Sequence, residues 1–314
     1  MTEEAGAARL VLGTMYYGTR IHPRDAFDLM DRFVAAGGRW LDTADCYTFW
    51  ADTAGRGGAS ESVIGEWLRR RPGVRDAVRI ATKVGQNPTV AHRWPETAEG
   101  LSASAILSGL EGSLERLGVE SVDLLWAHAE DRRVPLEETV ASFGEVVSRG
   151  AAARVGAANH PAWRVERART IAASLGVEPW SAVQLRYSLV EPRPGAPLPD
   201  AGHRLLTPDD LDHAVAEALD VWAYTPLLNG GYTRTDRPLP EAYDHPGTAR
   251  RLRALDEVAN ETGATRNQVV LAWLLRQGIS PLVGVSTMAQ LDEAIAATDL
   301  TLDAEHLRRF ADAR

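Results

Sequence analysis

Short apolar segments alternate along this chain with longer segments in which apolar residues recur at helical spacing. The short segments are rich in Val, Leu, Ala and Trp, a composition typical of strands that are buried on both faces. Eight of them occur, at 10–15, 39–44, 78–84, 122–128, 153–159, 181–188, 219–226 and 280–286. Helices are predicted between them, for example at 24–36, 60–71, 103–117, 136–149, 162–175, 209–218, 266–277 and 288–297.

Eight strand-then-helix units in this order predict an α/β protein of the (β/α)8 or TIM-barrel type, with the helices in an outer ring. The alternative is an open, doubly wound sheet, which needs a glycine-rich turn after its first strand. The sequence LGTMYYGT at 12–19 matches GxGxxG poorly. A length of 314 residues suits one barrel with insertions, since about 250 residues are typical. We therefore expect a single domain over residues 1–314.

Long loops are predicted after the second, third, sixth and seventh strands. They cover residues 48–59, 85–101, 189–208 and 229–247. All four follow strands, so they lie at the carboxyl end of the barrel, where barrel enzymes carry their active sites. Loops of this length are often functional.

Charge and composition argue against several classes of protein function. The net charge is -9 and the basic residues are dispersed, which argues against a nucleic-acid surface and against attraction to anionic lipid. No apolar run approaches the roughly 18 residues of a membrane span. The single cysteine, Cys46, excludes an intramolecular disulfide, and a reducing cytoplasm is the expected location. No HExxH, CxxC, GxSxG or P-loop motif occurs, so no metal site is expected. The oligomeric state stays open.

Four polar residues stand where strands of the predicted barrel end. Asp42 and Tyr47 belong to RWLDTADCY, and Lys83 and His128 close the next two strands. Side chains alternate along a strand, so Asp42, Lys83 and His128 would each point inward, above the residue two positions earlier. A free tyrosine has a pKa of about 10, and a nearby ammonium is expected to lower it. The set therefore predicts a proton relay in which Tyr47 is a general acid.

Each of these residues also has an ordinary structural interpretation. An Asp–Lys pair is commonly a structural ion pair, and a histidine at a strand end is commonly held by its neighbours. The placement of all four at consecutive strand ends favours the functional interpretation.

At these residues the chain resembles the aldo-keto reductase family. DTADCY (42–47) looks like the Asp-to-Tyr motif of that family, IATKVG (80–85) like its lysine strand, and VDLLWAH (122–128) like its histidine strand. The similarity continues through VGAANH (155–160), VQLRYS (183–188), WAYTPLLNGG (222–231), ATRNQVVLAWLLRQG (264–278) and PLVGVSTMAQLDEA (281–294).

The resemblance implies a barrel that binds a nicotinamide cofactor without a Rossmann domain and transfers its hydride to a carbonyl carbon. Tyr47 would donate the proton, assisted by Lys83 and Asp42, and His128 would position the carbonyl group. A small-molecule aldehyde or ketone is the expected substrate. Oxidation of an alcohol with NAD and a redox-sensing subunit that binds NAD(P) are the alternatives.

The resemblance also implies the residues that hold the cofactor. Asn159 and Gln184 would hold the nicotinamide carboxamide, and Tyr224 would stack on the ring. The residues expected along the pyrophosphate and adenosine are Thr225, Leu227, Asn229, Gly284, Ser286, Gln290 and Glu293.

Three positions depart from the family pattern: Ala158 replaces the usual Ser, Gln290 replaces a common Arg, and Ala294 replaces a common Asn. A 2'-phosphate favours a cation, and residues 281–294 contain none. NADPH is the expected cofactor, NADH is possible, and the substitute cations to consider are Arg234, Arg237 and Arg250.

An aromatic wall is predicted around the substrate, since ligand pockets are mostly apolar. Its members would be Tyr16, Tyr17, Phe49, Trp50, Trp94 and Trp126, although Trp126 suits the barrel core equally well. Arg186 and Tyr187 come from the sixth strand and are further possibilities, with core packing as the alternative for Tyr187. Cys46 is expected to be an inert thiol, because its neighbour Asp45 is anionic.

Overall fold

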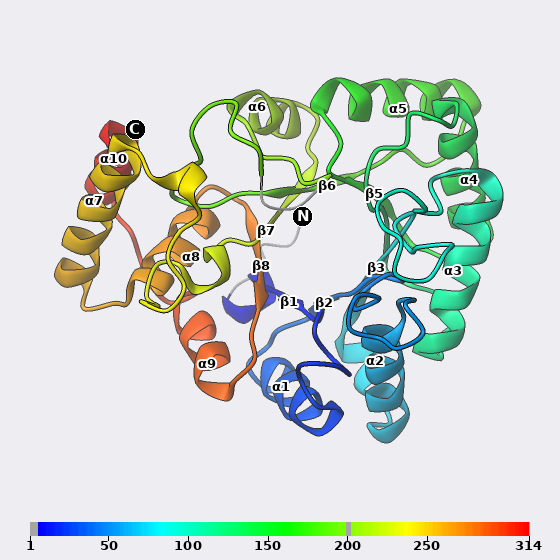
Figure 1. The fold of residues 1–314 in the computed structure, drawn as a ribbon, viewed down its shortest axis with the longest axis horizontal. Coiled ribbons are helices and arrows are strands. Elements are labelled where there is room, and N and C mark those ends of the chain that lie inside the picture. Colours follow the sequence, from blue (N-terminus) through cyan, green and yellow to red (C-terminus); the bar gives the residue numbers. More distant parts are fainter. Residues whose placement is uncertain (1–5, 199–201, 314) are drawn as a thin grey trace.

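The computed structural model describes residues 6–198 and 202–313. Its eight parallel strands close into a barrel in which each strand pairs with the next and β8 pairs with β1 (Figure 1). They are β1 (Val11–Gly13), β2 (Trp40–Asp42), β3 (Arg79–Val84), β4 (Leu124–Ala127), β5 (Val155–Ala158), β6 (Ala182–Arg186), β7 (Asp220–Tyr224) and β8 (Ser280–Gly284). The predicted (β/α)8 fold is confirmed as a single domain. Residues 199–201 of the third predicted loop lie outside the described residues.

Helices surround this barrel (Figure 1). They are α1 (Pro23–Ala35), α2 (Ala59–Arg70), α3 (Ala103–Leu117), α4 (Leu136–Ser148), α5 (Ala162–Leu175), α6 (Pro208–Ala216), α7 (Pro246–Thr262), α8 (Arg266–Arg276), α9 (Met288–Ala296) and α10 (Ala304–Asp312). Short 3₁₀ helices cover Gly6–Arg9, Val74–Ala77, Leu228–Gly230 and Glu241–Tyr243. The eight named helix predictions are all present, whereas α7 and α10 were not predicted.

Side-chain alternation divides the buried residues into two cores. The first fills the inside of the barrel and consists of Val11, Trp40, Ala81, Leu124, Trp126, Ala182 and Trp222. Within it the Trp222 ring meets the rings of Trp40 and Trp126 edge-on, with centroids 5.1 and 5.2 Å apart. The second and larger core lies between the strands and the helices. Side chains two residues apart on a strand point the same way, so the polar residues that follow the three indoles lie above them, at the rim of the barrel.

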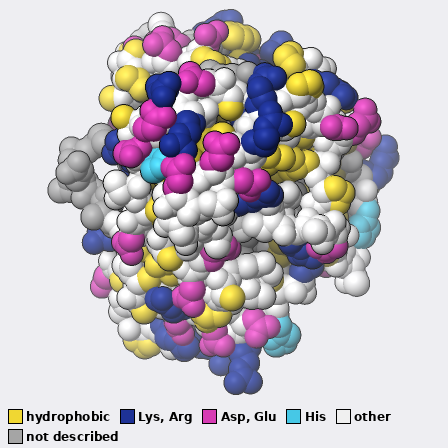
Figure 2. Space-filling view, turned by 90° about the vertical axis from the view of Figure 1, so that its left-hand side faces the viewer, with side chains coloured by type: hydrophobic (Ala, Val, Ile, Leu, Met, Phe, Trp, Pro, Cys, Tyr) yellow, Lys and Arg dark blue, Asp and Glu magenta, His cyan; other side chains and the backbone are white. Residues whose placement is uncertain are grey.

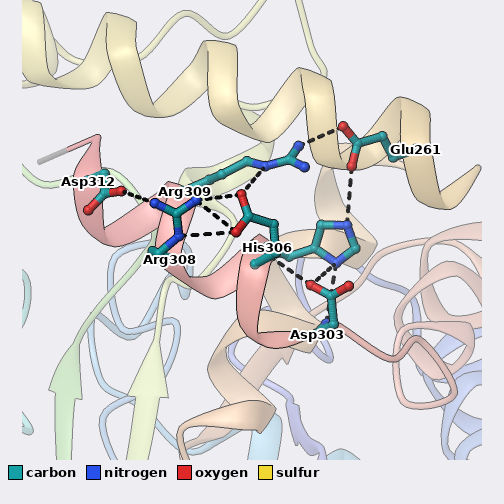
Figure 3. Close-up of polar contacts among 7 residues, drawn as sticks. Glu261, Asp303, His306, Arg308, Arg309 and Asp312 are labelled. Carbon is teal, nitrogen blue, oxygen red and sulfur yellow. Dashed lines mark hydrogen bonds and ion pairs between the residues drawn. The ribbon is translucent and has the colours of Figure 1, made fainter.

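The surface that carries α7 and α10 mixes both signs of charge (Figure 2). Figure 3 shows one such network, in which Glu261 of α7 accepts from Arg309 Nη1 at 2.6 Å and from His306 Nε2 at 3.3 Å. This face therefore lacks the concentrated basic character of a nucleic-acid surface. None of the helices in the described part of the chain has the length and apolar composition that a membrane span requires.

Docking of α10 is expected to depend on its buried aromatic residue. Phe310 is buried, whereas Arg309 and Glu261 form an exposed ion pair. The variant Phe310→Ala should lower the free energy of unfolding by about 3–5 kcal/mol. The matched variant Arg309→Gln on the same helix should have a much smaller effect, because exposed ion pairs contribute little. Denaturant unfolding of both variants measures the difference, and equal losses would contradict this account.

Candidate active site

The ammonium group of Lys83 is the centre of a buried hydrogen-bond cluster at the barrel rim. Its Nζ donates to Asp42 Oδ2 at 2.5 Å, to Tyr47 OH at 2.6 Å and to the carbonyl oxygen of Thr43 at 2.7 Å. Lys83 and Asp42 are buried, while Tyr47 is partly exposed. All three donors of the ammonium are therefore used, and two of them fix the residues that the sequence places in the proton relay.

The chain reaches this geometry because β2 and β3 stay paired beyond the end of β2. The backbone N–H of Thr43 donates to Ala81 O at 2.9 Å, and that of Asp45 donates to Lys83 O at 3.1 Å. The following loop then packs tightly, since a Cβ atom on Gly57 would lie 2.1 Å from the carbonyl oxygen of Asp45. This pairing holds the start of the loop beside β3, and Tyr47 turns back toward Lys83.

His128 completes the rim beside Tyr47. The two rings meet edge-on with centroids 5.9 Å apart. Its Nδ1 lies 3.4 Å from Cys46 Sγ, and its carbonyl oxygen accepts from Asn159 Nδ2 at 3.1 Å. The structure thus brings the four predicted relay residues together, and their chemical roles stay predictions.

Burial dominates the protonation of this cluster. It raises the pKa of Tyr47 well above its usual value, and the negative charge of Asp42 adds to this effect. The expectation that Tyr47 has a lowered pKa is therefore wrong, because burial of the phenol and the negative charge of Asp42 outweigh the opposing effect of the Lys83 ammonium. Burial also lowers the pKa of His128 well below its usual value, and the charge of Lys83 contributes to this. At neutral pH the site then presents a neutral phenol and a neutral imidazole.

The hydrogen bond from Lys83 gives the phenol a direction for proton transfer. Because the Tyr47 oxygen accepts from Nζ, its own proton can be donated to a ligand. As that proton leaves, the same Nζ hydrogen bond favours the phenolate that forms. Burial raises the pKa of Asp42, and the Lys83 ammonium opposes this rise. The charged carboxylate and the charged ammonium therefore stabilise each other. This arrangement can donate a proton to an oxygen atom in the barrel mouth.

The residues expected around a nicotinamide lie at the neighbouring strand ends. Tyr224 OH donates to Asn159 Oδ1 at 2.7 Å, which joins the end of β7 to the end of β5. Gln184 Nε2 donates to Asp42 Oδ1 at 3.1 Å, a contact that the sequence did not predict. His203 was also missed, and its ring lies against Tyr224 with centroids 5.0 Å apart. Two side-chain amides and an aromatic ring therefore border the relay.

The residues expected further along the cofactor form two groups. After β7, Thr225 and Asn229 have left-handed backbones, with φ of 55° and 57°, and Leu227 is partly buried between them. After β8, Gly284 is exposed and the Gln290 side chain accepts from Ser286 N at 2.8 Å. Glu293 accepts from Thr265 Oγ1 at 2.6 Å and from Asn267 Nδ2 at 3.1 Å, which ties α9 to α8.

Three predicted aromatic residues gather on the loops beside the relay. The Phe49 ring lies 5.0 Å from Trp50 and 6.0 Å from Trp94 between centroids, and Trp50 is 44% exposed. Tyr16 is partly exposed under the guanidinium of Arg20, which lies 4.6 Å from its ring centroid.

Other residues predicted near the substrate lie elsewhere in the structure. Tyr17 is fully buried in the outer core, and Trp126 belongs to the core inside the barrel. Tyr187 packs against Trp273 in the outer core. Arg186 is buried, and its Nε donates to Tyr243 OH at 3.4 Å.

Comparisons of the sequence and of the fold with known proteins all find reductases or other oxidoreductases. The sequence model of the "Aldo/keto reductase family" matches residues 9–314. "Uncharacterized oxidoreductase YrpG" of Bacillus subtilis is 30% identical over 317 residues, covering 97% of this chain and 91% of that protein. "Norsolorinic acid reductase stcV" of Emericella nidulans is 27% identical over 319 residues, covering 96% and 77%. The crystal structure of the thermostable aldo-keto reductase Tm1743 with the inhibitor epalrestat aligns with a TM-score of 0.72 and 25% identity, covering 98% and 95%.

Proposed function

The chain belongs to the aldo-keto reductase family, and from this premise we propose that it reduces an aldehyde or ketone to an alcohol with hydride from a nicotinamide cofactor. Membership makes it an NAD(P)H-dependent oxidoreductase. The proposal that Tyr47 is the general acid depends on one observation. Lys83 Nζ lies within hydrogen-bond distance of both Tyr47 OH and Asp42 Oδ2, and the Tyr47 ring meets the ring of His128.

The residues around the relay suit a nicotinamide. Asn159 and Gln184 carry amide donors and acceptors that can pair with a carboxamide in place of their present contacts within the protein, and the partly exposed ring of Tyr224 offers a flat surface. When bound, the reduced cofactor supplies the hydride. Tyr47 donates its proton to the carbonyl oxygen while Lys83 stabilises the phenolate that remains.

His128 orients the substrate in this proposal. Its Nδ1 faces Cys46, so its Nε2 is the nitrogen available to a carbonyl oxygen. The low pKa of the imidazole keeps it neutral, and a neutral ring places no second positive charge beside Lys83. The reverse reaction, oxidation of an alcohol, would use the same residues with Tyr47 accepting the proton. A purely redox-sensing subunit would not require all four.

A reductase assay tests the proposal directly. Purified protein should consume NADPH or NADH in the presence of an aromatic aldehyde, which suits the wall formed by Phe49, Trp50 and Trp94. Loss of the nicotinamide absorbance measures turnover, and fluorescence titration measures cofactor binding. Cofactor binding without reduction of any aldehyde or ketone tested would contradict the proposal and favour the sensing subunit.

The choice between NADPH and NADH depends on the end of the site near α9. The resemblance favours NADPH, yet residues 284–294 supply Asp292 and Glu293 and no cation. Of the substitutes considered, Arg234 is already paired with Asp236, whose Oδ1 accepts from Nε at 3.0 Å. We therefore propose weak discrimination, with both cofactors supporting turnover.

An arginine at position 290 is expected to restore a preference for NADPH. The variant Gln290→Arg should shift the ratio of kcat/KM values toward NADPH by roughly 10–100-fold, as charged hydrogen bonds contribute about 1.5–3 kcal/mol. The control Ala296→Arg adds the same charge at the far end of α9 and should leave the ratio unchanged. An equal shift in both variants would mean that net charge, and not a local phosphate contact, sets the preference.

A further inference from the structure

The only cysteine of this chain lies among potential metal ligands. Single ligand atoms of Asp45, Cys46 and His128 all lie within 4.8 Å of one another. The loop after β2 supplies Asp45 and Cys46, and the end of β4 supplies His128, 82 positions further along the chain than Cys46. No motif in the sequence signals this set, because the barrel assembles it. We propose that these three residues bind a divalent transition-metal ion, with Zn²⁺ the best match.

The spacing suits a tetrahedral ion. With bond lengths of about 2.0–2.3 Å to nitrogen, oxygen and sulfur, neighbouring ligands of zinc lie roughly 3.5 Å apart. Cys46 Sγ and His128 Nδ1 are already 3.4 Å apart. The Asp45 carboxylate lies within 4.8 Å of both other ligand atoms, so binding requires it to approach them by up to about 1 Å. Sulfur, nitrogen and oxygen ligands together favour zinc over the hard cations calcium and magnesium.

The state of Asp45 is an independent observation that favours a cation. Asp45 is 1% exposed, and no N–H or O–H donor of the described residues reaches its carboxylate oxygens. The side chain within hydrogen-bond reach is a second acidic group, Glu99, so two carboxyl groups share a buried position and a metal ion would compensate their negative charge. The acidic side chains of Glu99 and Glu61 lie near it, and Arg116 pairs with Glu61 at 2.6 Å. The environment of the carboxylate is therefore rich in negative charge.

Three protein ligands leave one coordination position for water or another small ligand. Cys46 and Asp45 are buried, whereas His128 is partly exposed. Metal binding uses the Cys46 thiolate, and the thiol proton is released to solvent. Asp45 and Cys46 have no role in the proposed reduction, whereas His128 would serve both the metal and the substrate.

Cobalt provides a direct test, because Co²⁺ bound to a thiolate absorbs strongly in the near ultraviolet. With one cysteine in the chain, any such band reports Cys46. Titration of the full chain with Co²⁺ should give a band that saturates at one equivalent and disappears when Zn²⁺ is added. Cys46→Ala should abolish the band, and Asp45→Asn should weaken Co²⁺ binding by more than about tenfold. The control His213→Gln removes a surface imidazole paired with Glu166 and should leave the band unchanged.

Thermal unfolding supplies a second measurement that does not depend on the absorbance of Co²⁺. Zn²⁺ should raise the melting temperature of the wild-type protein and not that of Cys46→Ala. The absence of a thiolate band at millimolar Co²⁺, or an equal zinc-induced shift in wild type and Cys46→Ala, would overturn the site. Neither measurement requires turnover, so failure of the metal site and failure of the proposed reductase function are distinguishable.

Discussion

Replacing Tyr47 with Phe is expected to lower the rate of carbonyl reduction by about 10²–10⁴-fold while cofactor affinity is retained. The phenylalanine ring keeps the edge-on contact with His128 and loses only the hydroxyl that Lys83 contacts at 2.6 Å. Without that hydroxyl the proton must come from water, whose oxygen is not held at this position. Steady-state kinetics with NADPH and an aldehyde measure the loss, and a fluorescence titration measures cofactor affinity.

The matched control for this variant is Tyr17→Phe. Tyr17 is fully buried in the outer core and its hydroxyl has no hydrogen-bond partner in the described part of the chain, so removing that oxygen should preserve turnover. Sustained reduction by Tyr47→Phe, within about tenfold of wild type, would exclude the phenol as the general acid. Loss of turnover in Tyr17→Phe would instead place that residue closer to the substrate than the structure does.

Strand positions and inward-facing residues could be predicted because both follow from a period of two. The alternation that places Trp40 and Ala81 inside the barrel also places Asp42 and Lys83 at its rim. The family motifs agreed with this pattern. The relay cluster could therefore be anticipated from short segments without knowledge of the strand register.

Two helices, α7 and α10, were not predicted from the sequence. The buried positions of α7 include Thr248 and Arg251 besides Ala254, Leu255 and Val258, so polar residues interrupt the apolar stripe. In α10 only Phe310 is buried among the described residues of that helix. The burial of these polar residues of α7 results from tertiary contacts, which local periodicity does not reveal.

Contacts across the barrel mouth could not be predicted from the sequence either. Gln184 reaches Asp42 from 142 positions away, and Cys46 meets His128 across 82 positions. Both contacts depend on how strands and loops are arranged around a closed sheet. The direction of the Tyr47 pKa was missed for a related reason, since burial acts on the whole cluster whereas the sequence suggested only the pairwise effect of Lys83.

Removal of the Lys83 ammonium is expected to affect stability and activity together. In Lys83→Met the Asp42 carboxylate remains buried without its cation, so the free energy of unfolding should fall by about 3–5 kcal/mol. Turnover should also fall, because Tyr47 loses the hydrogen bond that stabilises its phenolate. Denaturant unfolding and steady-state kinetics measure the two losses separately.

The double variant Asp42→Asn/Lys83→Met separates these effects. It removes both charges, so most of the lost stability should return, since replacing a buried ion pair as a unit costs far less than breaking it. The amide oxygen introduced at position 42 would still accept from Gln184 Nε2, which keeps the link between β2 and β6. Turnover should stay low, because no ammonium contacts the Tyr47 oxygen. A double variant that regained both stability and turnover would show that Lys83 only balances a buried charge, and the proton relay would then have to be abandoned.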